Sequence, residues 1–251
     1  MIQSTSLILT LAFPDIRMPE FAPFVVVAFL GTAFLLFAAV VGGAIALAFR
    51  KPRIARWIGA GGLLAVSGYA ALLLGSSFLS REKTLQPGEK KYFCEIDCHL
   101  AYSVVRASTA KALGRLPQLV AASGTFQIVT VRTWFDETTI ASFRGYAPLT
   151  PNPRMAYLVD TAARRYRFSP AGQKAWEDEH GPTTPLTKEL RPGESYETTL
   201  VFDLPDGARN PRLFLGDDPL GVESVLIGHE NSPLHRKIYF ALTSKVREDA
   251  S

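Results

Sequence analysis

Residues 21–49 read FAPFVVVAFLGTAFLLFAAVVGGAIALAF and contain no charged side chain. Residues 57–79, WIGAGGLLAVSGYAALLLGSSFL, form a second run with the same property. Each run is longer than the stretch of about 20 apolar residues that crosses a bilayer as a helix. A cleaved signal peptide fits poorly, because the first run is too long for one and the second follows it directly. The sequence therefore predicts a two-helix transmembrane hairpin over 21–79, preceded by an N-terminal interfacial segment over 1–20.

The short loop between the two runs, RKPRIAR, carries only basic charge. Its cations are Arg50, Lys51, Arg53 and Arg56. Basic residues in short loops stay on the cytoplasmic side of a membrane. We therefore expect the hairpin to lie in the inner (cytoplasmic) membrane of a bacterium with both its ends outside the cytoplasm. Everything after Leu79 is then expected in the periplasm.

The positive charge is concentrated in the hairpin. Residues 1–79 contain five Lys or Arg and two Asp or Glu, which gives +3. The whole chain has 27 Lys or Arg and 23 Asp or Glu. Residues 80–251 therefore contain 22 basic and 21 acidic residues and carry a net charge of +1. Nucleic-acid binding requires a basic stripe or patch that pairs with phosphates. Because the remainder is nearly neutral, the sequence predicts the lipid bilayer and other protein subunits as partners, and no nucleic acid.

A stripe of small residues lies along the second apolar run. Gly61, Gly68 and Gly75 recur every seven residues, with Ala65 between the first two, and seven residues are close to two helical turns. Small residues let membrane helices approach closely. The stripe therefore predicts a helix-packing face, and two readings stay open. Either the two helices pack only on each other, or a third helix from another subunit packs on this face.

The chain after the hairpin has the pattern of a β-protein. A polar linker is expected over 80–90, and residues 196–204, YETTLVFDL, alternate as in a half-buried strand. Further strand candidates are 126–134, 157–160, 213–215, 224–227 and 238–242. Ser169 and Pro170 predict the start of a helix over 169–180. We expect an all-β antiparallel sandwich over 91–244 and a C-terminal tail over 245–251, so the fold class is an α+β membrane protein.

One short phrase occurs twice. Leu85 begins LQPGE and Leu190 begins LRPGE, and each phrase leads into an alternating segment. Proline presets φ and glycine accepts a positive φ, so Pro-Gly predicts a tight turn. Two copies are too few for a repeat architecture, but they predict two similar entries into strands.

The two cysteines of the chain lie in YFCEIDCHL, residues 92–100. Alternation from Tyr92 to Val104 predicts one long strand with Cys94 and Cys98 on its buried face. Residues four apart in a straight strand are about 13 Å apart, whereas a disulfide needs Cα atoms within about 7 Å. The periplasm nevertheless favours disulfides. Three possibilities stay open: a turn that lets the two cysteines form a disulfide, two buried free thiols, or a bound metal.

A metal site would use these cysteines and nearby histidines. The candidate ligands are Cys94, Cys98, His99, His229 and His235. Thiolate and imidazole together suit copper(I) or zinc, and copper is the candidate cofactor. The Cys-x3-Cys spacing resembles the copper loop of cytochrome oxidase subunit II, which also has a two-helix hairpin and a periplasmic sandwich. In that family a histidine and a methionine stand where Tyr102 and Arg106 stand here, so an intact dinuclear copper site is not expected.

Three phrases resemble the immunoglobulin-like, telokin-type sandwich of bacterial membrane-anchored proteins. They are GTFQIVTVRTWFDE from Gly124, YLVDTAARRYRFS from Tyr157 and LRPGESYETTLVFDLP from Leu190. Together with the hairpin, the chain is similar to accessory subunits of bacterial electron-transfer complexes, such as the small subunit that braces a photosynthetic reaction centre against its antenna. The resemblance implies a non-catalytic structural subunit that braces partner subunits of a photosynthetic or respiratory complex.

The sequence contains none of the common catalytic motifs. A Gly-x-Ser-x-Gly elbow, a phosphate-binding loop and a His-Glu-x-x-His pair are all missing, so no enzyme is predicted. Aromatic and arginine side chains are favoured anchors at protein interfaces. The candidates are Trp134, Tyr146, Arg154, Trp176 and Arg212. The alternative is a membrane-anchored periplasmic copper-binding or electron-transfer protein that uses the cysteines and histidines.

Overall fold

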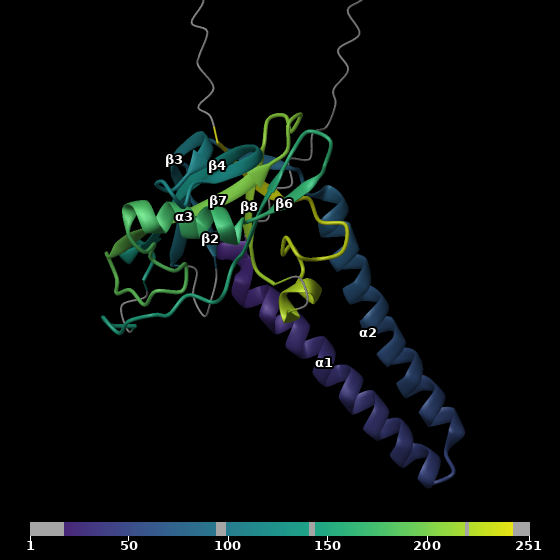
Figure 1. Cartoon of the computed structure of the whole chain (residues 1–251). Helices are drawn as coiled ribbons and strands as arrows, with labels where there is room; N and C mark the ends of the chain where they lie inside the picture. The colour runs from purple at the N-terminus through teal and green to yellow at the C-terminus, as the bar shows by residue number, and fades with distance from the viewer. Residues whose placement is uncertain (1–17, 94–98, 141–143, 219–220, 243–251) are drawn as a thin grey trace, which may run out of the picture. The chain divides into compact units, whose positions relative to one another are not determined.

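The computed structural model describes residues 18–93, 99–140, 144–218 and 221–242 (Figure 1). The chain divides into two compact units, Met1–Leu72 and Leu73–Ser251. Helix α1 (Met18–Ala48) and most of helix α2 (Pro52–Leu79) belong to the first unit, and the strands belong to the second. The predicted layout of two long helices followed by a sandwich is confirmed. Each unit is described by itself.

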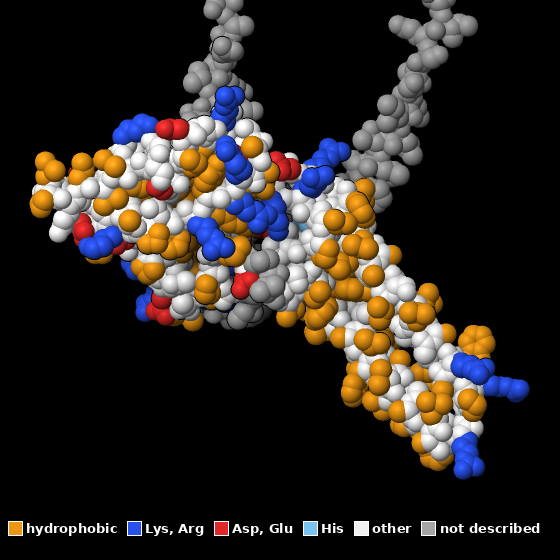
Figure 2. All heavy atoms as spheres, turned by 45° about the vertical axis from the view of Figure 1, so that its right-hand side comes forward, with side chains coloured by type: hydrophobic (Ala, Val, Ile, Leu, Met, Phe, Trp, Pro, Cys, Tyr) orange, Lys and Arg blue, Asp and Glu red, His pale blue; other side chains and the backbone are white. Residues whose placement is uncertain are grey.

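Both helices are long and apolar enough to cross a membrane. The candidate spans are Phe24–Ala48 and Pro52–Leu79, with 25 and 28 residues. At 1.5 Å per residue these correspond to roughly 37 and 42 Å. Large apolar side chains stay exposed along them, for example Phe24 at 72% and Trp57 at 80% (Figure 2). A helix pair that exposes so much apolar surface requires an apolar environment or a partner.

The turn between the helices brings the four predicted topology residues together. The N–H groups of Arg50 and Lys51 donate to the carbonyl oxygens of Leu47 and Ala46 at 2.9 and 2.8 Å. Arg50 has a φ of 54°, so the first helix ends in a Schellman motif with a left-handed residue. The exposed basic residues around this turn are Arg50, Lys51, Arg53 and Arg56. The charge predicted for the loop is therefore concentrated at one end of the hairpin.

The helices of the first unit contact each other through glycines outside the predicted stripe. A Cβ atom added at Gly62 would lie 2.9 Å from the Cβ of Ala39, and one added at Gly42 would lie 3.5 Å from Ile58. Among the described residues, nothing lies within 4 Å of the same position at Gly61 or Gly68. Hence α1 and α2 do not use the glycines of the stripe to pack on each other. The reading in which a further helix uses the stripe stays a prediction.

The second unit contains two sheets. One has the order β1 (Lys83–Leu85), β9 (Ile238–Ala241), β8 (Arg212–Gly216), β5 (Met155–Val159) and β6 (Arg165–Arg167). The other has the order β2 (Lys91–Phe93), β3 (Leu100–Leu113), β4 (Val120–Phe135) and β7 (Ser195–Leu204). Neighbouring strands are antiparallel except β1 and β9, which are parallel. The predicted antiparallel sandwich is therefore correct apart from this one pair.

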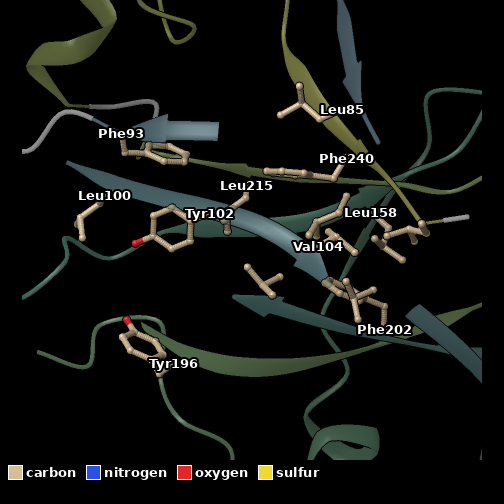
Figure 3. Packing of buried hydrophobic residues seen from close by; sticks show 14 of the residues in the cluster. Leu85, Phe93, Leu100, Tyr102, Val104, Leu158, Tyr196, Phe202, Leu215 and Phe240 are labelled. Atoms are coloured by element: carbon tan, nitrogen blue, oxygen red, sulfur yellow. The ribbon is translucent and has the colours of Figure 1, made fainter. Parts of the chain in front are cut away.

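The two sheets share one hydrophobic core. Its fully buried side chains come from both sheets and include Tyr102, Phe135, Leu158, Phe202, Leu213 and Phe240. Figure 3 shows Tyr102 and Tyr196 of one sheet packed in the same cluster as Leu215 of the other. The inner face predicted for 196–204 is confirmed, because Tyr196, Phe202 and Leu204 belong to this core. The strand is not half-buried as predicted, because Val201 on its other face is buried as well. Interdigitation of two inner faces is the usual source of stability in a β-sandwich.

Helix α3 (Pro170–His180) begins where the sequence predicts and packs on the outer face of the four-stranded sheet. Ser169 Oγ accepts a hydrogen bond from the Gly172 N–H at 3.1 Å, and Pro170 occupies the first turn. The helix lies so close to the sheet that a Cβ atom at Gly172 would be 2.7 Å from the Phe126 ring.

A side chain of α3 also covers the long free edge of β7. Gln173 Oε1 accepts from the Val201 N–H at 3.0 Å, and Gln173 Nε2 donates to the Thr199 carbonyl at 3.1 Å. The glutamine thus takes the place of a neighbouring strand. Exposed strand edges invite pairing with other chains, and this contact covers the edge of β7 at Thr199 and Val201.

Segments 80–90 and 224–227 differ from the prediction. Residues 80–90, predicted as a linker, contain β1, with Lys83 paired to Ile238 of β9. Residues 224–227, predicted as a strand, lie instead in a loop that begins with the 3-10 helix η2 (Val222–Val225). The Leu226 N–H donates to the Glu223 carbonyl at 3.2 Å. A short apolar run gains ladder hydrogen bonds only beside another strand, and here it satisfies its N–H groups locally.

Candidate binding groove on the four-stranded sheet

The two LxPGE phrases form matching turns. In one, the Glu89 carboxylate accepts from the Gln86 N–H at 2.5 Å; in the other, the Glu194 carboxylate accepts from the Arg191 N–H at 2.8 Å. The backbone closes in the same way, because the Glu89 N–H donates to the Gln86 carbonyl at 2.9 Å and the Glu194 N–H to the Arg191 carbonyl at 3.0 Å. The sequence echo therefore marks two copies of one local structure.

Both turns need their glycine and are fastened to the same sheet. Gly88 and Gly193 have φ values of 86° and 83°, a region that residues with a Cβ seldom adopt. The Gly88 N–H donates to the Val104 carbonyl at 2.8 Å, and the Gly193 N–H donates to the Phe135 carbonyl at 2.9 Å. The turns are thus held to β3 and to the end of β4.

A groove of about 300 Å³ lies against this sheet, and both turns line it. Its lining comes from three strands and the two turns: Ala101, Ser103 and Val105 of β3, Arg132 and Trp134 of β4, Ser195 of β7, and Gly88, Lys90 and Gly193. In the strand register Trp134 lies between Ala101 and Ser195. Because the side chains on either side of Trp134 are small, the indole ring and the Arg132 side chain are the large groups of the groove.

The cations of the groove are held in place. Lys90 Nζ lies 3.4 Å from the centroid of the Trp134 ring, which is a cation–π contact. Arg132 Nη2 donates to Glu197 Oε1 at 2.8 Å, with half of the arginine side chain exposed. Burial alone would raise the pKa of Asp136, but hydrogen bonds from Thr138 and Tyr92 and the charge of Lys90 hold that pKa below its ordinary value. The groove thus presents fixed positive charge next to an aromatic ring.

The chemistry of this lining suits binding. The lining residues include two serines, a lysine and an arginine but no histidine, cysteine or carboxylate. Tryptophan and arginine are the residues on which protein interfaces most often depend. Sequence reasoning named Trp134 as an interface candidate but missed Arg132 and Lys90.

The segment with the cysteines does not form one long strand. β2 and β3 pair antiparallel, with Lys91 opposite Tyr102 and Phe93 opposite Leu100. The chain therefore reverses direction between Phe93 and Leu100, and the straight strand predicted over 92–104 is wrong.

The reversal also changes which side of β2 is buried. Lys91 and Phe93 are buried while Tyr92 is only partly so, the opposite of the alternation predicted from the sequence. Cys94 and Cys98 lie outside the described residues. The disulfide, the bound metal and the free thiols remain the three alternatives predicted from the sequence.

The three candidate histidines have separate protein partners. His99 is buried, its Nδ1 lies 2.6 Å from Thr139 Oγ1, and its ring stacks on Phe135. His235 Nδ1 lies 2.8 Å from the Arg236 carbonyl. His229 Nε2 faces Asp217 Oδ2 at 3.5 Å. Over the described ranges, no group of three or more His, Cys, Asp or Glu is placed to hold a metal ion, so copper stays a prediction.

A buried charge pair joins β2 to the loop before β9. Lys91 Nζ donates to Glu230 Oε1 at 2.6 Å and to the Leu215 carbonyl at 2.5 Å, and the two charged side chains are 6% and 9% exposed. Burial lowers the pKa of the Lys91 ammonium, and the neighbouring Glu230 carboxylate opposes this shift. Buried charges are costly unless paired, so this contact fixes the position of the loop.

Further polar contacts hold the same loop. Arg154 pairs with Asp217, and its guanidinium lies over the Phe93 ring at 4.3 Å from the centroid. The Asn231 side chain donates to the Asp217 carbonyl at 3.1 Å, and the Lys237 ammonium donates to Asn231 Oδ1 at 3.0 Å. Arg154, predicted as an interface anchor, is instead an internal residue with a side chain only 1% exposed.

Acid is expected to weaken this loop through His229. Burial lowers the pKa of its imidazole, and the Asn231 N–H donates to Nδ1 at 3.1 Å, which requires that nitrogen to be unprotonated. As the pH falls below the ordinary histidine pKa of about 6.5, His229 becomes protonated in the unfolded chain but stays neutral in the folded chain. The free energy of unfolding then falls.

The variant His229→Gln should reduce this dependence on pH, as measured by urea denaturation of the full chain in mild detergent between about pH 7 and pH 5. Burial lowers the pKa of His235 as well, so the slope is reduced and not abolished. His180→Gln, at an exposed position of α3, is the control. A slope unchanged by His229→Gln contradicts the prediction.

Comparisons with known proteins find structural likeness only. No family model and no curated protein matches the chain. One similar solved structure is a conserved hypothetical protein from Bacillus anthracis, with 19% identity and a TM-score of 0.36, over 50% of this chain and 84% of that one. Another is the secreted protein MPT63 from Mycobacterium tuberculosis, with 12% identity and a TM-score of 0.38, over 64% of this chain and 97% of that one.

Proposed function

We propose that this chain is a membrane-anchored, non-catalytic subunit whose sandwich holds a partner protein outside the cytoplasm. The observation that carries the proposal is the groove between the matched turns, on a chain that also has two exposed apolar helices. The groove supplies a place for a partner, and the helices supply the anchor. Accessory subunits of photosynthetic or respiratory complexes are one class with this combination.

The anchor is supported by the exposed apolar side chains of α1 and α2. A soluble helix hairpin would bury such side chains, and contiguous exposed apolar surface marks a membrane or partner contact. The basic turn from Arg50 to Arg56 indicates the cytoplasmic end. The sandwich then follows α2 on the opposite side of the membrane, which is the periplasm in a bacterium.

A protein partner is supported by the residue types in the groove. An aromatic ring, a guanidinium and an ammonium are together at Trp134, Arg132 and Lys90, and each can contact apolar and acidic groups of another chain. Part of the positive charge of the groove is already compensated, because Arg132 pairs with Glu197. We therefore expect a partner segment that stacks on Trp134 and replaces or extends the contacts of the two cations with its own carboxylates.

Loss of the Trp134 ring should release the partner. The full chain carries a tag, is solubilised from its native membrane in mild detergent, and is purified with the proteins bound to it. Hot-spot truncations cost about 2 kcal/mol or more, so Trp134→Ala should lower recovery of the bound subunits at least roughly tenfold. Arg132→Ala should act in the same direction.

Tyr146, also an interface candidate from the sequence, is exposed and does not line the groove, so Tyr146→Ala is expected to leave recovery unchanged if the groove is the binding site. The thermal unfolding of each variant is measured alongside to separate binding from folding. If the wild-type chain purifies alone, or if Tyr146→Ala and Trp134→Ala behave alike, the groove is not the binding site.

A further inference from the structure

The loop before β9 carries exposed apolar side chains although polar contacts hold it firmly. Its described part, 221–236, is drawn towards the yellow end of the colour scale in Figure 1. Val222, Val225 and Leu234 are 61%, 41% and 62% exposed. Leu234 also has a φ of 65°, which is unusual for a residue with a bulky side chain. Strained residues persist only where their surroundings hold them.

The loop is a preformed structure. Ser232 Oγ donates to the Leu226 carbonyl at 2.5 Å, which brings its two halves together. The buried pair of Glu230 with Lys91 fastens it to β2. Because these contacts fix the backbone, exposing the apolar side chains is a property of the folded loop and not of a loose segment.

The end of this loop touches the residue that follows α2. The Arg236 N–H donates to Ser80 Oγ at 2.8 Å, and the Lys83 N–H donates to the Lys237 carbonyl at 3.3 Å. Ser80 comes directly after Leu79, the last residue of the candidate span. Two residues of chain reach at most about 7 Å, so the Leu234 Cα lies within roughly 10 Å of Ser80 Oγ.

That distance is comparable to the depth of the polar layer of a bilayer. The hydrocarbon core is about 30 Å thick and the headgroup layers add several Å on each side. Arg81, Lys83 and Arg236 are exposed on the same stretch, and cations near the membrane surface are attracted to anionic lipids. Apolar side chains with flanking cations are typical of segments that lie in the interface.

We propose that loop 221–236 rests on the bilayer surface, with Leu234 inserted at the level of the lipid headgroups. This inference rests on the proposed membrane anchor and adds a second contact with lipid. It gives the sandwich a fixed side towards the membrane, because a single helix end would leave the domain free to tilt.

Photocrosslinking of the full chain in nanodiscs with phosphatidylglycerol and phosphatidylethanolamine tests this contact. The photoreactive residue p-benzoylphenylalanine is placed in turn at 234, at 64 and at 116. Leu64 is an exposed residue of α2, and Leu116 is 85% exposed on the turn between β3 and β4. Mass spectrometry of the irradiated chain then distinguishes lipid adducts from protein adducts.

We expect lipid adducts at 64 and 234, with position 234 labelled at least roughly fivefold more than position 116. Labelling at 64 without labelling at 234 would overturn the surface contact and leave the membrane anchor intact. A lack of lipid adducts at 64 would overturn the anchor and the surface contact together. Equal labelling at 234 and 116, or a protein adduct at 234, would also overturn the proposed contact with lipid.

Discussion

Replacing Glu230 by leucine is expected to lower the free energy of unfolding by about 3–5 kcal/mol, because it leaves a buried ammonium without its partner. Lys91 Nζ is 2.6 Å from the Glu230 carboxylate, and both side chains are more than nine-tenths buried. The Leu215 carbonyl also accepts a hydrogen bond from this ammonium, but it cannot neutralise the charge. Urea denaturation of the full chain in mild detergent measures the loss.

The double variant Lys91→Met/Glu230→Leu should recover most of that stability. Replacing a whole buried ion pair by apolar residues of similar size is often neutral or stabilising by about 1–4 kcal/mol. Lys174→Ala breaks an exposed pair with Asp178 and should change the free energy of unfolding by less than about 0.5 kcal/mol. Equal losses in the single and double variants would show that the ammonium charge is not the cause.

Elements that depend on local pattern are predicted well from this sequence. The alternation of YETTLVFDL gives β7, Ser169 and Pro170 give the start of α3, and two long apolar runs give α1 and α2. The strand predicted over 224–227 is wrong because an apolar run of that length is compatible with either a strand or a turn. Only a neighbouring strand decides between them, and periodicity does not reveal neighbours.

Contacts between distant residues could not be predicted in the same way. Lys91 and Glu230 are 139 positions apart, and no local pattern in the sequence connects them. β2 pairs antiparallel with β3, and Lys91 is buried. The sequence alternates without a break from Tyr92 to Val104 and so gives no sign that two strands are present. Side-chain burial follows strand pairing, which local pattern leaves undetermined.

The sequence predicts the two turns of the groove but not that they line the same groove. The repeated LxPGE phrase correctly predicts two similar turns, at Gly88 and at Gly193. That both turns line one groove depends on how β3 and β4 pair, because the register sets Trp134 opposite Ala101 and Arg132 opposite Ser103. A repeated turn motif beside an aromatic residue and a cation is the signal that could have pointed to this site.

A row of aromatic rings crosses the outer face of the five-stranded sheet. Tyr157 of β5, Phe214 of β8 and Tyr239 of β9 are opposite one another in the register. The Phe214 ring lies 4.7 Å from the Tyr157 ring and 6.0 Å from the Tyr239 ring, measured between centroids. Lys91 and Lys237 place their ammonium groups 5.0 and 5.5 Å from the centre of the Phe214 ring. Phe214 is therefore the central contact between this face and the loop before β9.

Phe214→Ala is expected to lower the free energy of unfolding by about 3–5 kcal/mol, as measured for large-to-small changes in protein cores. The ring is 1% exposed, so its removal leaves a cavity and also takes away the aromatic face next to the Lys91 ammonium. Tyr146→Ala, at a ring that is 78% exposed, should cost less than about 0.5 kcal/mol.

The same substitution made in the Lys91→Met/Glu230→Leu background tests how the ring acts. Residues in contact give non-additive losses of about 0.5–3 kcal/mol in double-mutant cycles. If the ring supports the buried ammonium, Phe214→Ala costs less in that background, because methionine at position 91 has no charge to stabilise. Identical losses in the two backgrounds would mean that Phe214 contributes through packing alone, and that the charge pair and the aromatic row stabilise the sandwich independently.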